Sequence, residues 1–171
     1  MDLTALRTPL TADDWKALGL DAMRVGAVTL VTGIPALGLP ETADGLPVDW
    51  FAAPAPEGPP PAHRNTVTRI DHLVVRVPSL DDAIAALPFE LRRVGGPRQW
   101  PMAFMRAGET IVELAEHGGG YQIWGVALRL DDLDAAAGPL VSAPHPAIQG
   151  GRMAEASRAW DGFTVAFFEK P

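Results

Sequence analysis

A histidine, a glutamate and two arginines interrupt stretches of the chain that are otherwise apolar. Glu113 lies in the segment TIVELAE, His72 and Arg76 lie in RIDHLVVRVP, and Arg129 lies in GVALRLDDLD. A carboxylate buried on an apolar strand costs several kcal/mol unless it is paired or protonated, so Glu113 needs a partner such as His72 or one of the arginines. In a partly buried pocket, a histidine base and a glutamic acid could move protons while an arginine stabilises a developing enolate.

The same residues also have a purely structural interpretation. A histidine near the start of a strand is often a hydrogen-bonded core residue, and a buried Glu–Arg pair can do no more than neutralise a charge. The elements that carry these side chains therefore have to be placed first.

An internal repeat organises the second part of the chain. The segment Ile70 to Leu87 aligns without a gap on Ile123 to Leu140, at an offset of 53 residues, with six identical positions. The same offset carries TIVELAE (110–116) onto FTVAFFE (163–169). Two copies of one unit are the simplest explanation, although a chance likeness between two β-α segments is the alternative.

Each copy predicts a strand, a capped helix and three further strands. Ser79 with Asp82, and Asp131 or Asp132, supply the oxygen acceptors that a helix N-terminus requires. The later strands are predicted at 91–94, 101–106 and 110–116 in the first copy, and at 140–143, 151–158 and 163–169 in the second. The fold class is therefore α+β, built from two βαβββ modules.

The first 63 residues differ from the rest. Thr11 and Asp14 have the spacing of a capped helix start, and the segments 24–32 and 48–52 predict strands. The proline-rich stretch that follows cannot enter a helix or the interior of a sheet. We expect an N-terminal extension at 1–53 that docks on the main domain, a linker at 54–65, and a main domain at 66–171 with modules at 66–117 and 121–171.

Composition excludes several classes of function. The chain has 171 residues, 47% of them hydrophobic, and a formal net charge of -7, which disfavours nucleic acid as a partner. It has no cysteine, so disulfides, thiolate metal sites and a cysteine nucleophile are excluded. No apolar run approaches the roughly 20 residues of a membrane span. We expect a cytoplasmic protein with a small-molecule partner, no membrane partner, and a homodimer as one candidate assembly.

The repeat and its motifs resemble the vicinal oxygen chelate superfamily, which includes glyoxalases, bleomycin-resistance proteins and dioxygenases. RIDHLVVRVP, TIVELAE and GVALRLDDLD are similar to three of its signatures in order and spacing, over about residues 66–171. AIQGGRM (147–153) and the ending FTVAFFEKP resemble an actinobacterial glyoxalase-like subgroup. The resemblance implies a fold in which the two modules enclose a cup for a small molecule.

The resemblance also implies a metal ion held by the first and last strand of each module. In the first copy these positions are His72 and Glu113, types suited to Zn, Fe, Mn or Ni. In the second copy they are Gly125 and Ala166, which cannot ligate. Because metal sites normally use three or more protein ligands, we expect no metal and no other cofactor, with a divalent metal as the alternative. The nearest substitutes, His117 and His145, are not predicted on cup strands.

Strand alternation predicts which side chains face the cup. If His72 faces inward, so do Val74 and Arg76, while Leu73, Val75 and Val77 pack under the helix. The repeat adds Gly125, Ala127 and Arg129, and the closing strands add Ile111, Glu113, Ala115, Thr164, Ala166 and Phe168. The candidate substrate-binding residues are Trp100, Met102, Phe104, Trp124, Ala127, Arg152 and Phe168.

Three functions compete at this stage. The first is a metal-independent isomerase or lyase in which His72, Glu113 and either Arg76 or Arg129 act on a small carbonyl compound. The second is a protein that binds or sequesters a ligand without changing it. The third is a metal-dependent lyase or dioxygenase, which requires further ligands. Other catalytic patterns, such as Gly-x-Ser-x-Gly or His-Glu-x-x-His, do not occur.

Overall fold

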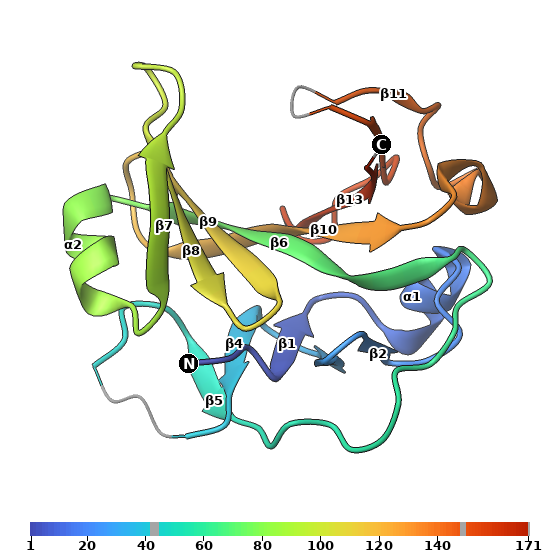
Figure 1. Cartoon of the computed structure of the whole chain (residues 1–171), viewed down its shortest axis with the longest axis horizontal. Helices are drawn as coiled ribbons and strands as arrows, with labels where there is room; N and C mark the ends of the chain where they lie inside the picture. Colours follow the sequence, from blue (N-terminus) through green and yellow to red (C-terminus); the bar gives the residue numbers. More distant parts are fainter. Residues whose placement is uncertain (42–44, 148–149, 171) are drawn as a thin grey trace.

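Two β-sheets, one above the other in Figure 1, make up most of the molecule. The computed structural model describes residues 1–41, 45–147 and 150–170. The larger sheet has eight strands in the order β11-β12-β13-β10-β6-β9-β8-β7, and the smaller has five in the order β2-β3-β1-β4-β5. The larger sheet is formed entirely by residues after the proline-rich stretch, and the smaller by residues before it.

The larger sheet consists of two βαβββ modules, which confirms the predicted fold. The first contains β6 (Val67–Val77), α2 (Leu80–Ala86), β7 (Glu90–Gly95), β8 (Met102–Ala107) and β9 (Thr110–Glu116). The second contains β10 (Gln122–Leu130), the 3-10 helix η1 (Leu133–Ala136), β11 (His145–Pro146), β12 (Arg152–Glu155) and β13 (Thr164–Glu169). Their first strands, β6 and β10, pair antiparallel and join the modules.

The register of pairing is the same in both modules. In the first, β6 and β9 run parallel with His72 opposite Ile111. In the second, β10 and β13 run parallel with Gly125 opposite Thr164, which are the positions 53 residues further along the chain. The sequence repeat is therefore a repeat of hydrogen-bonded structure.

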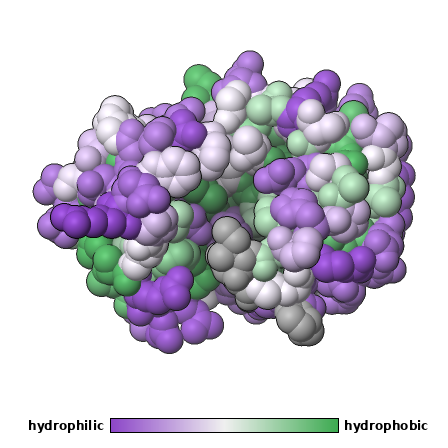
Figure 2. All heavy atoms as spheres, turned by 90° about the horizontal axis from the view of Figure 1, so that it is seen from above, coloured by the Kyte–Doolittle hydropathy of each residue, from purple (hydrophilic) through white to green (hydrophobic). Residues whose placement is uncertain are grey.

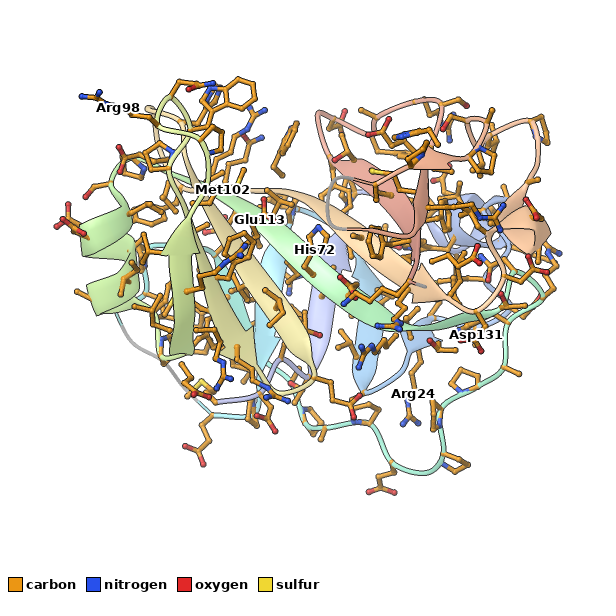
Figure 3. All side chains as sticks on the ribbon, turned by 45° about the horizontal axis from the view of Figure 1, so that its top comes forward. Arg24, His72, Arg98, Met102, Glu113 and Asp131 are labelled. Carbon is orange, nitrogen blue, oxygen red and sulfur yellow. The ribbon has the colours of Figure 1, made fainter. Side chains whose placement is uncertain are left out.

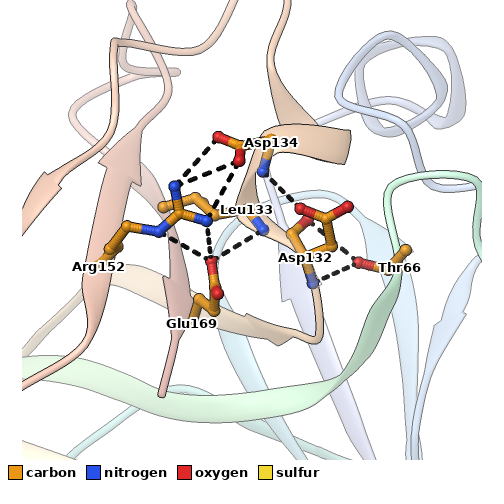
Figure 4. Close-up of polar contacts among 6 residues, drawn as sticks. All are labelled: Thr66, Asp132, Leu133, Asp134, Arg152 and Glu169. Atoms are coloured by element: carbon orange, nitrogen blue, oxygen red, sulfur yellow. Dashed lines mark hydrogen bonds and ion pairs between the residues drawn. The ribbon is translucent and has the colours of Figure 1, made fainter. Parts of the chain in front are cut away.

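Both modules also hold their helix start in the same way. The backbone N–H of Leu80 donates to Glu116 Oε2 at 2.9 Å, and that of Leu133 donates to Glu169 Oε2 at 3.1 Å. The predicted caps are confirmed, with Ser79 accepting from the Asp82 amide and Asp132 accepting from the Asp134 amide. A glutamate at the end of each closing strand thus ties the helix to the sheet (Figure 4).

The second module departs from the prediction in two places. Its helix is a single 3-10 turn, because Gly138 and Pro139 end it. Its second strand was expected at 140–143 but lies at His145–Pro146, while Val141 makes only an isolated bridge to Ala156. With prolines on both sides of His145, this edge strand stays short.

The smaller sheet contains more elements than we predicted. The helix α1 (Ala12–Ala17) begins with the expected capping box between Thr11 and Asp14. The segment expected as one strand is a hairpin of β2 (Arg24–Val25) and β3 (Val28–Thr32), which turns at Gly26 with φ +58°. The strands β1 (Ala5–Thr8) and β4 (Ala36–Leu39) were not predicted, whereas β5 (Trp50–Ala52) falls in the segment predicted as a strand.

The proline-rich stretch is held along the smaller sheet by hydrogen bonds. The Arg24 guanidinium donates to the carbonyl oxygens of Glu57 at 2.6 Å and Gly58 at 2.8 Å. Further on, the buried ring of His63 accepts from the Asp21 N–H at 3.0 Å and lies 2.9 Å from the Arg24 carbonyl oxygen. These contacts anchor the backbone where proline leaves few donors of its own.

A single hydrophobic core spans both sheets. It includes fully buried side chains of the smaller sheet, such as Leu6 and Leu37, together with Leu73, Val75 and Val77 of β6. The sheet face predicted to pack inward is therefore buried, and the opposite face remains open. Among the described residues, no helix is long and apolar enough to cross a membrane.

The Glu169 contacts predict a measurable contribution to stability. Replacing Glu169 by alanine leaves the Leu133 N–H and the Arg152 guanidinium, 2.6 Å from Glu169 Oε2, without this acceptor. We expect the free energy of unfolding to fall by about 1–3 kcal/mol in urea denaturation. Glu155→Ala, which removes an exposed carboxylate from the adjacent strand, should change it by less than about 0.5 kcal/mol. Equal effects of the two substitutions would contradict this assignment.

Candidate functional site

A cup lies on the face of the larger sheet that the smaller sheet does not cover. Seen from above, the surface is hollowed between the two modules, with apolar residues in the hollow and hydrophilic residues around it (Figure 2). The main cavity has a volume of about 540 Å³ and extends over the second module. Smaller compartments adjoin it on the first module. The residues that line the main cavity include His72, Val74, Trp124, Ala127, Met153, Thr164 and Ala166.

Irregular pairing between β6 and β10 decides which side chains enter the cup. His72 lies opposite Ala127 but Ile70 lies opposite Leu128, so Asp71 is an extra residue on β6. Trp124 is likewise extra on β10, between Ile123 and Gly125. A bulge of this kind turns two successive residues toward the same side. Asp71 therefore joins His72, and Trp124 joins Gly125, on the cup face.

His72 is held by the carboxylate beside it in the chain. Its Nδ1 lies 3.1 Å from Asp71 Oδ2, and the Lys170 ammonium lies 3.6 Å from Asp71 Oδ1. Burial alone would raise the pKa of Asp71, but the hydrogen bond from His72 and the charges of Lys170, His72 and Arg69 outweigh burial and lower this pKa. An ionised carboxylate only accepts hydrogen bonds, so Nδ1 is the donor in this contact, and in a neutral imidazole Nε2 then carries the free electron pair.

Glu113 lies next to His72, and its pKa is shifted in the opposite direction to that of Asp71. Its strand β9 pairs with β6 so that Glu113 is opposite Val74, and Figure 3 shows His72 and Glu113 on the same face of the sheet. Both side chains line the same two small compartments. Burial raises the pKa of Glu113, and the charges of His72 and Arg93 offset this only in part. The site therefore pairs an oriented imidazole with a carboxyl group whose pKa is raised by burial.

Neither arginine predicted as a partner of Glu113 makes an ion pair with it. The Arg76 guanidinium stacks on the Trp124 ring, 4.1 Å from the ring centroid. Arg129 lines none of the cavities found among the described residues. The cation that the sequence did not indicate is Arg93, which stacks on Phe104 at 4.6 Å from the ring centroid and lies within electrostatic range of Glu113.

The residues predicted to bind substrate fall into separate compartments. Trp100, Met102 and Trp124 line one of about 200 Å³ together with Arg76. Phe104 lines a second, and Ala127 and Phe168 line a third. Arg152 instead donates to Glu169 at 2.6 Å and to Asp134 at 3.2 Å, away from the cup (Figure 4).

The donor set fits a metal ion poorly. The register places Gly125 opposite Thr164 and Ala166 opposite Ala127, so neither vacant position has a donor side chain. Among the described residues, no group of three or more His, Asp or Glu side chains is close enough to hold a metal. His145 is exposed, with its Nδ1 facing the adjacent Pro146 carbonyl oxygen, and His117 is exposed at a compartment edge. His72 and Glu113 supply two of the three or four ligands that such ions require.

Besides Arg93, two contributors to the site were missed in the sequence. Asp71 and Lys170 were not candidates, because strict alternation places Asp71 on the opposite face from His72 and because Lys170 follows the last predicted strand. The one available signal was the adjacency of Asp71 and His72. That signal is weak, because side chains adjacent on a regular strand point to opposite faces.

The raised pKa of Glu113 predicts how stability depends on pH. A carboxyl group whose pKa is higher in the folded state stabilises the fold at low pH, and this contribution is lost as the pH rises through the raised value. We expect the free energy of unfolding of the wild type, relative to Glu113→Gln, to fall as the pH rises from the ordinary carboxyl value of 4.5 through the range above it. Urea denaturation across this range measures it. Glu155→Gln, at an exposed position, should show a smaller trend, and a rising difference for Glu113→Gln would contradict the assignment.

The surroundings of Gly125 predict that a side chain introduced at this vacant ligand position would lower stability. A Cβ atom there would lie 2.7 Å from the Thr164 carbonyl oxygen and would also clash with Thr164 Oγ1. We expect Gly125→Ala to lower the free energy of unfolding by about 1–3 kcal/mol, measured by urea denaturation. Gly138→Ala, where a Cβ would meet no atom within 4 Å, is the matched control. Equal stability of the two variants would contradict this account.

Comparisons with solved structures agree with the architecture. The 4-hydroxymandelate synthase of Streptomyces coelicolor, in mutant form, is similar with a TM-score of 0.56 and 12% identity, covering 98% of this chain and 92% of that one. A fusion of a xylose isomerase-like TIM barrel with 4-hydroxyphenylpyruvate dioxygenase gives 0.60 and 11%, covering 98% and 49%. The methylmalonyl-CoA epimerase of Mycobacterium tuberculosis gives 0.50 and 18%, covering 62% and 90%.

These likenesses concern the fold. No protein-family model and no curated protein matches the sequence. At identities of 11–18%, the structural matches establish shared architecture and leave activity to be argued from the site. The chain therefore has the vicinal oxygen chelate fold, with two βαβββ modules around one cup.

Proposed function

We propose that this protein is an acid–base catalyst that moves a proton on a small carbonyl compound, as an isomerase or lyase. The observation that carries the proposal is the hydrogen bond from His72 to the buried carboxylate of Asp71, beside a glutamate whose pKa is raised by burial. A base and an acid with separated pKa values in one cup are the minimum that such chemistry needs.

Each group has a role in the proposed reaction. His72 Nε2 takes a proton from the carbon next to the carbonyl, and the electron pair left behind moves into the carbonyl as an enol forms. Glu113, protonated, donates its proton to the carbonyl oxygen, so no full negative charge develops. Return of a proton to carbon from either face, or loss of a leaving group from the neighbouring carbon, then gives an isomer or an elimination product.

Asp71 and Lys170 are positioning residues in this scheme. Asp71 holds the imidazole ring through Nδ1 and stabilises the imidazolium that forms when Nε2 accepts a proton. Lys170, 3.6 Å from Asp71, keeps that carboxylate ionised. The surrounding apolar side chains strengthen these interactions by lowering the local dielectric.

We further propose that the reaction uses neither a metal ion nor another cofactor. Support comes from the chemistry of the donor set, which offers two ligands where three or more are usual. A metal-dependent lyase or dioxygenase would need ligands from beyond the described residues of this chain. We also place the chain in the actinobacterial glyoxalase-like subgroup, on the segment 147–153, of which residues 148 and 149 lie outside the described residues.

The second candidate function is ligand binding without chemistry, as in drug-sequestering proteins. It is favoured by the cavity of about 540 Å³ and by its largely apolar lining. The two functions differ in one respect that can be measured. A sequestering protein binds its ligand and returns it unchanged, whereas a catalyst exchanges a proton on it.

Proton exchange tests the proposed catalysis. In D2O, the protein should accelerate deuterium incorporation next to the carbonyl of phenylpyruvate or hydroxyacetone, followed by proton NMR. We expect His72→Gln to abolish this acceleration, and Asp71→Asn to lower it about 10- to 1000-fold, because the imidazole loses the partner that orients it. Binding without exchange in the wild type would favour the sequestering function.

Matched controls separate the mechanism from its competitors. His145→Gln removes an exposed histidine outside the cup and should leave exchange unchanged. Incubation with EDTA should also leave exchange unchanged, and elemental analysis of untagged protein should find no stoichiometric metal. Exchange that disappears with EDTA would establish the metal-dependent alternative.

A further inference from the structure

Arg76 is a partly buried arginine of the cup that makes no ion pair with another described residue. On the second module, Arg152 pairs with Glu169 at 2.6 Å and Arg158 pairs with Asp14 at 2.5 Å. No carboxylate oxygen among the described residues lies within 4 Å of the Arg76 guanidinium, although that side chain is partly buried. A partly buried cation is costly to keep unpaired unless a ligand supplies the anion.

The compartment around Arg76 is apolar. It has a volume of about 200 Å³ and is lined by Trp100, Met102, Trp124, Val74 and Ala115, with Arg76, Glu113, Glu116 and His117 among its polar residues. The guanidinium plane lies over the Trp124 ring, 4.1 Å from its centroid. This cation–π contact holds the guanidinium in place, and its N–H groups, which make no hydrogen bond to another described residue, remain available to a planar anion.

Trp100 forms the outer wall of this compartment. It is 58% exposed, which is unusual for so large an apolar side chain. The turn that carries it is tight, because the Trp100 N–H donates to the Pro97 carbonyl oxygen at 2.8 Å. Gly96 adopts φ +95°, and a Cβ there would lie 2.6 Å from the Trp100 carbonyl oxygen. The hairpin is thus built to present Trp100 at the compartment.

We propose that this compartment binds a flat aromatic ring bearing one carboxylate, which pairs with Arg76 while the ring lies between Trp100, Met102 and Trp124. The inference deepens the proposed function and rests on it, because Glu113 lines both this compartment and the one next to His72. A carboxylate fits better than a phosphate dianion, because Glu116 adds negative charge to the compartment wall and a second charge on the ligand would increase the repulsion.

Binding of three probes tests the assignment. Isothermal titration calorimetry compares 1-naphthoate with 1-naphthamide, which lacks the charge, and with cyclohexanecarboxylate, which lacks the flat ring. We expect the wild type to bind 1-naphthoate at least about tenfold more tightly than either, as a charge-assisted hydrogen bond would give. Undetectable 1-naphthoate binding, or equal affinity for 1-naphthoate and 1-naphthamide, would overturn the proposal.

Two variants and a control locate the binding. Arg76→Gln should remove the preference for 1-naphthoate over 1-naphthamide, whereas Trp100→Ala should weaken both. Arg98→Gln makes the same change of charge on the exposed hairpin loop, outside this compartment, and should bind as the wild type does (Figure 3). An equal loss in Arg76→Gln and Arg98→Gln would show a general charge effect and would refute the site.

The outcome can be separated from that of the proposed catalysis. His72→Gln should bind 1-naphthoate with unchanged preference even though it no longer exchanges protons. Preference for 1-naphthoate without any exchange in the wild type would refute the catalytic proposal and leave the aromatic carboxylate site standing. Proton exchange without a preference for 1-naphthoate would refute the aromatic carboxylate site and leave the catalytic proposal standing.

Discussion

The antiparallel pairing of β6 with β10 is the interaction on which the rest of the structure depends. It joins two modules of the same register into one eight-stranded sheet and sets the floor of the cup. Its register shifts at three points, and two of the extra residues, Asp71 and Trp124, are turned toward the cup. A regular ladder would leave His72 without its carboxylate and Arg76 without its aromatic surface. The same local departure from alternation therefore supplies both halves of the candidate site.

The two modules share a scaffold and differ in chemistry. Glu116 and Glu169 bind equivalent helix starts, and the parallel strand pairs have identical registers. The positions of His72 and Glu113, by contrast, become Gly125 and Ala166. Ala166 lines the cavity over the second module, whereas the approach of Thr164 to Gly125 leaves no room there for a side chain. The first module supplies His72 and Glu113, and the second module supplies most of the lining of the main cavity.

The arrangement of charged groups also differs between the scaffold and the cup. On the scaffold, arginines and carboxylates neutralise each other, as in the Arg152 contacts with Asp134 and Glu169. In the cup, neighbouring carboxyl groups are not neutralised in this way. The pKa of Asp71 is lowered, and the pKa of Glu113 is raised. The smaller sheet, with the proline-rich stretch bound along it, covers the face of the larger sheet that is opposite the cup. The cup face therefore remains open. Two neighbouring carboxyl groups therefore have pKa values shifted in opposite directions.

The sequence by itself determined the βαβββ repeat, the caps at Thr11, Ser79 and Asp132, and the inward set of His72, Val74 and Arg76. These features depend on periodicity and on hydrogen bonds between residues close in the chain, so they can be recognised locally. Only the tertiary structure decided that Asp71 and Trp124 enter the cup, that Arg152 pairs within the scaffold, and that β1 and β4 exist at all. A bulge or an ion pair depends on the partner strand and its register, and that partner lies tens of residues away. Alternation along a strand predicts which residues share a face of the sheet. Pairing with the neighbouring strand decides which residues depart from that alternation.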